Sequence, residues 1–195
     1  MYTIFHSLID VHCAMVERPH MRVITWAFLA TLSLVLMVQL RGLDSDLRLP
    51  DVPNGIVSYE LAWSGTRAAT VIDAWRSAGV IEQAKVSLGV DFAFLLAYPF
   101  MFSVGAALLV RKTPNGRVDR VGQTLSRAVL CCIPLDATEN IVLWRMLDAG
   151  ASSLLAHIGT ICAVIKFALV LMTAIWCAAA IGRRVMLSGK PHTSG

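Results

Sequence analysis

Three ionisable side chains inside apolar stretches of the chain have the types and the spacing for acid–base chemistry. Asp136 and Glu139 lie three residues apart, so a helix over residues 121–147 places both carboxyl groups on one face. Lys166 lies in a separate apolar segment and could bring an ammonium group to them. Two close carboxyl groups beside a cation titrate at different pH values, which lets one act as an acid and the other as a base. If the chain is an enzyme, we therefore predict that Asp136, Glu139 and Lys166 are its catalytic residues.

Asp91, Tyr98 and Asn140 are the candidate ligand-binding residues. Asp91 and Tyr98 are seven residues apart and share one face of a predicted helix over 88–110, while Asn140 follows Glu139 on the acidic face. The three carboxyl groups could instead offer oxygen ligands to a divalent cation. A di-iron bundle needs Glu-x-x-His pairs on two different helices, which the chain does not have, and we predict no metal site. The sequence indicates no particular cofactor.

The same residues could also form a structural core that binds no ligand. A buried triad of Asp136, Glu139 and Lys166 would satisfy its own charges and fix the register of two helices. Asn140 could make an interhelical hydrogen bond worth ~0.6–2 kcal/mol, and Tyr98 could be a packed aromatic residue. Because spacing does not separate a binding site from an ion-paired core, both interpretations stay open.

The composition is that of a membrane protein. Of the 195 residues, 56% are hydrophobic and only 15% are charged, and the mean hydropathy is +0.66. Soluble domains have about 45–50% apolar and about 25% charged residues. A chain of this length fits one domain, so we treat residues 1–195 as a single transmembrane domain.

Four segments are predicted to cross the membrane as helices, which gives an all-α, integral membrane four-helix bundle. Three of the segments, at about 22–41, 88–110 and 154–182, are strongly apolar. The first has 18 uncharged residues between Arg22 and Arg41. At 1.5 Å per residue they span about 27 Å, which is close to the ~30 Å thickness of the hydrocarbon core.

The remaining segment, at about 121–147, contains four charged residues. A central carboxylate that faces lipid costs ~2.5–3.5 kcal/mol, so Asp136 and Glu139 must face other helices. Arg127 and Arg145 lie near the two ends of the segment and can extend to the membrane surface. We expect this segment to cross the membrane, and a surface or re-entrant helix is the alternative.

Basic residues are distributed unequally along the chain. With four spans, the two termini and the second loop share one side, which has nine bases against five on the other side. The nine are Arg18, Arg22, Arg111, Lys112, Arg117, Arg120, Arg183, Arg184 and Lys190. Because cytoplasmic loops are rich in Lys and Arg, we predict a multi-pass protein of the cell membrane with both termini in the cytoplasm. The ionisable residues then lie in the outer half and the middle of the membrane, so a polar pocket would open to the outside.

Three short amphipathic helices are predicted outside the spans. Residues 2–18 have apolar side chains at three- and four-residue spacing and would lie on the membrane surface. In the long first extracytoplasmic loop, helices at 55–64 and 66–79 are too short to cross the bilayer and would cover the outer end of the bundle. Val57 and Leu61 are interpreted as the apolar face of the first loop helix.

Three other residues of this loop have predicted positions. Trp63 and Trp75 are expected at the level of the lipid head groups, where tryptophan is enriched. Glu60 is interpreted as a solvated charge, with a role in a lid as the less favoured reading.

The remaining patterns bear on partners. Ala174, Ala178 and Gly182 form a small-residue ladder that favours close packing within the bundle or a homo-oligomer. The five cysteines include no C-x-x-C pair, which excludes the quinone-linked four-helix disulfide enzymes. The net charge of +4 does not gather into a basic stripe, so nucleic acid is not an expected partner. Membrane lipids are the expected partner.

Together these patterns lead to two hypotheses about function. The first is a polar intramembrane pocket that binds a lipid-like or small amphiphilic ligand and performs an acid–base step. The second is a structural or assembly subunit, without catalysis, whose buried charges form an ion-paired core. The sequence does not settle whether the protein is an enzyme.

Overall fold

The computed structural model describes residues 19–110 and 116–188, and these residues are almost entirely helical. The elements in order are α2 (Pro19–Leu47), α3 (Ile56–Glu60), α4 (Gly65–Ala78), α5 (Ile81–Leu109), α6 (Arg117–Ala128), the 3-10 turn η2 (Val129–Cys131), α7 (Cys132–Ala149) and α8 (Ser153–Ser188). The described residues contain no strand, and a single isolated β-bridge joins Leu49 to Val52. The all-α prediction is confirmed. The helix predicted at 2–18 lies outside the described residues.

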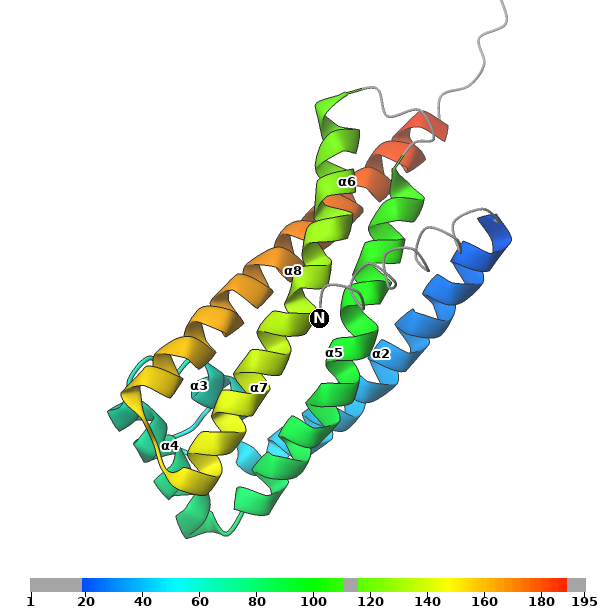
Figure 1. Cartoon of the computed structure of the whole chain (residues 1–195). Helices are drawn as coiled ribbons and strands as arrows, with labels where there is room; N and C mark the ends of the chain where they lie inside the picture. The colour runs from blue at the N-terminus through cyan, green and yellow to red at the C-terminus, as the bar shows by residue number, and fades with distance from the viewer. Residues whose placement is uncertain (1–18, 111–115, 189–195) are drawn as a thin grey trace, which may run out of the picture.

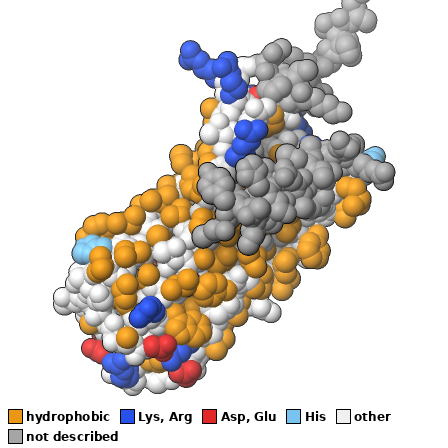
Figure 2. Space-filling view, viewed as in Figure 1, with side chains coloured by type: hydrophobic (Ala, Val, Ile, Leu, Met, Phe, Trp, Pro, Cys, Tyr) orange, Lys and Arg blue, Asp and Glu red, His pale blue; other side chains and the backbone are white. Residues whose placement is uncertain are grey.

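Three helices are long and apolar enough to cross a membrane. They cover His20–Leu47, Ile81–Leu109 and Ser153–Met186. They contain the predicted spans at 22–41 and 154–182 and all but the last residue of the span at 88–110. At 1.5 Å per residue each exceeds the ~30 Å hydrocarbon core. Figure 2 shows one face of the molecule, where hydrophobic side chains cover the body and most charged side chains lie towards the two ends.

The predicted fourth segment is a helix with an interruption. α6, η2 and α7 follow one another and pack along α5 and α8 (Figure 1). Pro134, early in α7, explains the tight turn before it, because proline has no N–H to donate to the carbonyl of Leu130 and its ring crowds that group. The interruption and the charges of the segment set it apart from the three apolar helices.

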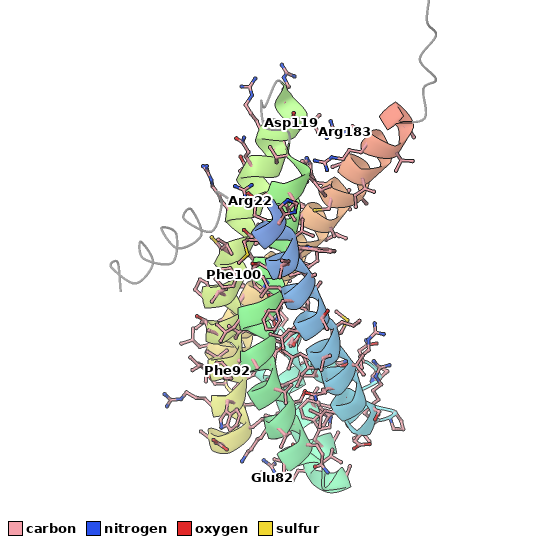
Figure 3. All side chains as sticks on the ribbon, turned by 90° about the vertical axis from the view of Figure 1, so that its right-hand side faces the viewer. Arg22, Glu82, Phe92, Phe100, Asp119 and Arg183 are labelled. Carbon is pink, nitrogen blue, oxygen red and sulfur yellow. The ribbon has the colours of Figure 1, made fainter. Side chains whose placement is uncertain are left out.

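α5 is the helix on which the others assemble. It packs against α2, α6, α7 and α8, whereas α2 packs chiefly on α5 (Figures 1 and 3). The two helices come close where a Cβ added at Gly105 would lie 2.8 Å from Nε1 of Trp26. Much of the rest of α2 is uncovered, including Phe28 and Val38, as expected of a helix that faces lipid.

The helices α3 and α4, which we call the roof, cover one end of α7 and α8 (Figure 1). α4 begins where Ser64 accepts a hydrogen bond from the backbone N–H of Arg67 and ends at Gly79, whose φ of 72° is left-handed. Trp75 is completely buried and donates from Nε1 to the carbonyl of Leu47 at 2.9 Å. Trp75 is thus covered by protein and joins the roof to the end of α2, while its level relative to the lipid head groups stays a prediction.

The end of the molecule opposite the roof is formed by α6 and the last turns of α8. In Figure 3, Asp119 and Arg183 lie near this end, which we call the α6 end, and Glu82 lies near the roof end. Trp176 donates from Nε1 to the carbonyl of Val118 at 3.0 Å and so joins α8 to α6. The α6 end and the roof end of the molecule therefore carry different residues and different contacts between helices.

Candidate functional site

The acidic face of α7 is turned towards the lysine of α8. Lys166 Nζ lies 2.7 Å from Oδ1 of Asp136 and 2.9 Å from Oε2 of Glu139. The exposed fraction is 6% for Lys166, 1% for Asp136 and 0% for Glu139. The structure thus brings together the three residues predicted to be catalytic, in a buried ion-paired group between two helices.

Two residues of α5, Tyr98 and Asp91, complete the arrangement on the same polar face of α7. Tyr98 donates its hydroxyl to Oδ2 of Asp136 at 2.9 Å, and Asn140 donates from Nδ2 to Oδ2 of Asp91 at 2.7 Å. The three residues predicted to bind a ligand therefore lie beside the three predicted to be catalytic. α7 presents its polar face to α5 and α8 together.

Local sequence explains why these helices can approach so closely. The spacing of three and four residues places Asp136, Glu139 and Asn140 on one side of α7. On α8, Gly159 and Ala163 belong to the small-residue face that carries Lys166. A Cβ at Gly159 would lie 3.4 Å from the side chain of Val142, so α7 is already in contact there.

Glu60 is a site residue that sequence reasoning missed. Interpreted above as a solvated charge, it is instead only 8% exposed, and its carboxyl group lies within electrostatic reach of Lys166 and Asp136. Val57 and Leu61, the apolar face assigned to this helix, are exposed, so that face is not the one packed on the bundle. The helix is too short for its periodicity to reveal which side faces the bundle.

Hydrogen bonds to the bundle hold α3 in this orientation. Tyr59 donates its hydroxyl to the carbonyl of Leu143 at 3.0 Å, and Thr160 donates to the carbonyl of Glu60 at 2.9 Å. α3 therefore contacts both α7 and α8, the two helices that carry the ion-paired group. Its last residue, Glu60, lies over the junction between them.

The end of α2 fixes the start of α3. Asp44 accepts a hydrogen bond from the backbone N–H of Ile56 through Oδ1 at 2.7 Å and pairs with Nε of Arg48 through Oδ2 at 2.8 Å. Gly55 makes the approach possible, since its φ is +53° and a Cβ there would collide with the carboxyl group of Asp44. A substitution at Gly55 would therefore displace the helix that carries Glu60.

The surroundings of Glu60 favour its neutral form. Burial raises the pKa of Glu60 above its ordinary value of 4.5, and the positive charge of Lys166 opposes this shift. The negative charges of Asp136 and Asp44 raise the pKa further. Glu60 can therefore hold a proton at the roof end of the site.

The group as a whole contains more acid than base. Among the described residues it consists of four carboxyl groups and one ammonium group, from Glu60, Asp91, Asp136, Glu139 and Lys166. Three buried acceptor atoms in it have no hydrogen-bond partner in the described part of the chain. Oε2 of Glu139 still contacts the ammonium of Lys166, which leaves Oε1 of Glu139 and Oδ1 of Asn140. A buried acceptor without a donor costs ~1–3 kcal/mol. The arrangement is thus not the self-satisfied triad considered above.

A metal centre receives no support from the geometry. In the described ranges, no set of three or more His, Cys, Asp or Glu side chains is arranged to hold a metal ion. Asp91 is hydrogen-bonded to Asn140, while Asp136 and Glu139 face Lys166, so the carboxyl groups point to different partners. The carboxyl groups of the site can exchange protons and accept hydrogen bonds.

Comparison with known proteins found no matching family model, no matching curated protein and no matching solved structure. The functional argument therefore depends on the geometry of this chain alone.

Proposed function

We propose that this chain is a membrane protein with four spans that binds a lipid-like or small amphiphilic ligand at the buried polar group of α5, α7, α8 and α3. The ligand enters from the outer side of the cell membrane, and both termini are cytoplasmic. Asp136, Glu139 and Lys166 supply the acid–base chemistry of the site, and Asp91, Tyr98 and Asn140 contact the ligand.

The position of the charges on α7 supports a fourth span. From Arg117 to Ala149 the interrupted helix is about 50 Å long at 1.5 Å per residue, enough to cross a bilayer. Its central carboxyl groups, those of Asp136 and Glu139, are covered by other helices, which removes most of the cost of exposing them to lipid. The outward side of α7 carries apolar residues such as Ile141.

The distribution of basic residues supports the orientation. Within the described ranges, Arg22, Arg120 and Arg183 lie in the parts of α2, α6 and α8 away from the roof. These parts are the cytoplasmic ends if the positive-inside rule holds. The roof then faces the outside, above the polar group.

The unpartnered acceptors are the observation that carries the proposal. A polar core that serves only stability is expected to satisfy its own hydrogen bonds, because each unsatisfied buried group is costly. Here Oε1 of Glu139 and Oδ1 of Asn140 accept nothing from the described residues, although both side chains are fully buried. A ligand that donates hydrogen bonds would complete the group.

The alternative is a structural or assembly subunit whose buried charges form an ion-paired core. The close contacts of Lys166 with Asp136 and Glu139 favour it, since both carboxyl groups are within 2.9 Å of the ammonium. In that case Ala174, Ala178 and Gly182, which are at least partly uncovered on α8, would contact a second copy of the chain.

A Glu139→Gln variant distinguishes the proposed ligand-binding site from an ion-paired structural core. In a binding site with surplus carboxyl groups, this change removes repulsion, so the melting temperature in detergent is expected to stay the same or to rise. In an ion-paired core it breaks one of the two contacts of Lys166 and is expected to cost ~3–5 kcal/mol. Glu82→Gln is the matched control, because the side chain of Glu82 is 80% exposed.

Native mass spectrometry of the same samples provides the second readout. The unmodified protein and Glu82→Gln are expected to retain a co-purified amphiphile, and Glu139→Gln is expected to lose it. A large loss of stability in Glu139→Gln, together with the absence of any retained amphiphile in the unmodified protein, would favour the structural subunit.

A further inference from the structure

The charge of the buried group indicates what kind of head group it would accept. Among the described residues the group has four carboxyl groups and one ammonium, that of Lys166, which contacts only two of them, Asp136 and Glu139. A buried charge is stable only when it is paired or neutralised. A head group with a positive charge would pair with carboxyl groups that burial otherwise keeps neutral, such as that of Glu60, whereas a phosphate, sulfate or carboxylate would add a further acidic group.

The acceptor atoms without a partner further restrict the chemistry of the head group. Oε1 of Glu139 and Oδ1 of Asn140 are acceptors, so the head group must bring donors. A primary ammonium has three N–H donors and no acceptor, a hydroxyl has one donor, and a trimethylammonium has none. A primary amine therefore fits both the charge and the hydrogen-bonding needs of the group.

Glu60 provides a carboxyl group at the roof end. It belongs to α3, a helix held to α7 and α8 through Tyr59 and Thr160, and its charge interacts with that of Lys166. Glu60 is thus separate in the chain from the acidic face of α7 and reaches the group from the side predicted to face the outside. A ligand that enters from there would meet Glu60.

We infer that the ligand is a cationic amphiphile, a long-chain primary amine, and that its ammonium group is bound by Glu139 and by Glu60 of the roof. This inference rests on the function proposed above. It adds the chemical class of the ligand and a binding residue, Glu60, in the first loop.

The experiment uses the full chain in phosphatidylcholine nanodiscs and four probes with the same ten-carbon tail. They are n-decylamine, which is protonated at neutral pH, decyltrimethylammonium, n-decanol and decyl sulfate. Binding is measured as a concentration-dependent rise in melting temperature, because a ligand that binds only the folded state stabilises it. Decylammonium is expected to bind at least about tenfold more tightly than the other three, as charge-assisted hydrogen bonds would predict.

Three variants test the role of Glu60. Glu60→Gln is expected to weaken decylammonium binding about tenfold, because it removes one charge-assisted contact. Glu60→Asp retains the charge and is expected to bind with intermediate affinity. Glu82→Gln, the same change at an exposed side chain, is expected to bind like the unmodified protein.

The outcomes distinguish this inference from the proposed function. If decanol or decyl sulfate binds best and Glu139→Gln abolishes that binding, the site takes an amphiphile but the amine is wrong. If Glu60→Gln binds decylammonium as tightly as Glu82→Gln does, Glu60 is not a binding residue. If no probe changes the melting temperature of the unmodified protein, both the inference and the proposed function are wrong.

Discussion

The two ends of this helical assembly handle buried polar groups in different ways. Beside the roof, Lys166 is buried and contacts two carboxyl groups at 2.7 and 2.9 Å. At the α6 end, the corresponding basic residue is Arg183, whose side chain is 43% exposed and lies 4.0 Å from the carboxyl group of Asp119. The lysine depends on its partners for charge balance, whereas the arginine reaches solvent.

The contacts between helices also differ between the two ends. At the α6 end, α6 and α8 meet through Trp176, whose ring lies against Gly122 and whose Nε1 donates to the carbonyl of Val118. Beside the roof, side chains bond to one another across three helices, and two acceptors are left over. The helices are therefore joined by the packing of a tryptophan at the α6 end and by polar side chains beside the roof.

Removal of the lysine is expected to have the largest effect on stability. A Lys166→Met change leaves Asp136 and Glu139 buried without their cation, which is expected to cost ~3–5 kcal/mol of unfolding free energy. Lys85→Met is the matched control, because Lys85 is more exposed and pairs with Asp148 and Glu82 near the surface. Because solvent screens these surface pairs, Lys85→Met is expected to lose much less stability than Lys166→Met. Equal losses of melting temperature in the two variants would contradict the contrast between buried and exposed lysine.

The parts of this molecule that could be predicted from sequence are those with a long-range pattern. Three spans follow from uninterrupted apolar segments, and the face shared by Asp136 and Glu139 follows from helical spacing. That this face turns to Lys166 follows from the cost of exposing charge to lipid. Each of these conclusions depends on a constraint that acts over many residues or carries a large energy.

The parts that could not be predicted depend on tertiary contacts of short segments. The spacing of Val57 and Leu61 does not show which side of α3 faces the bundle, because a five-residue helix is oriented by its anchors at Asp44 and Thr160 and not by its own periodicity. Glu60 was consequently placed in solvent. The contact between Gly122 and Trp176 was equally hidden, since a lone glycine in a helix has no pattern to indicate its neighbour.

Substitution of Gly122 is expected to have an intermediate effect, confined to the α6 end. A Cβ there would collide with the ring of Trp176, and such overpacking costs ~1–3 kcal/mol. Gly89→Ala is the matched control, because Gly89 is also in a helix but a Cβ there meets nothing within 4 Å. It is expected to raise stability by up to ~1 kcal/mol through helix propensity. If Gly122→Ala is as stable as Gly89→Ala, the α6 end is packed more loosely than the contact with Trp176 implies.

The smallest effect is expected for Arg183→Ala. Its contact with Asp119 is long, at 4.0 Å, and the arginine side chain reaches solvent, so the pair is expected to contribute ~0–1 kcal/mol, less at high salt. The melting temperature should therefore change little, and the change should shrink further when salt is added. Asp119 itself is 5% exposed and has an oxygen without a hydrogen-bond partner in the described part of the chain. A loss near that of Lys166→Met would mean that this carboxyl group depends on Arg183 as the buried acids of α7 depend on Lys166, and the distinction between the two ends would not hold.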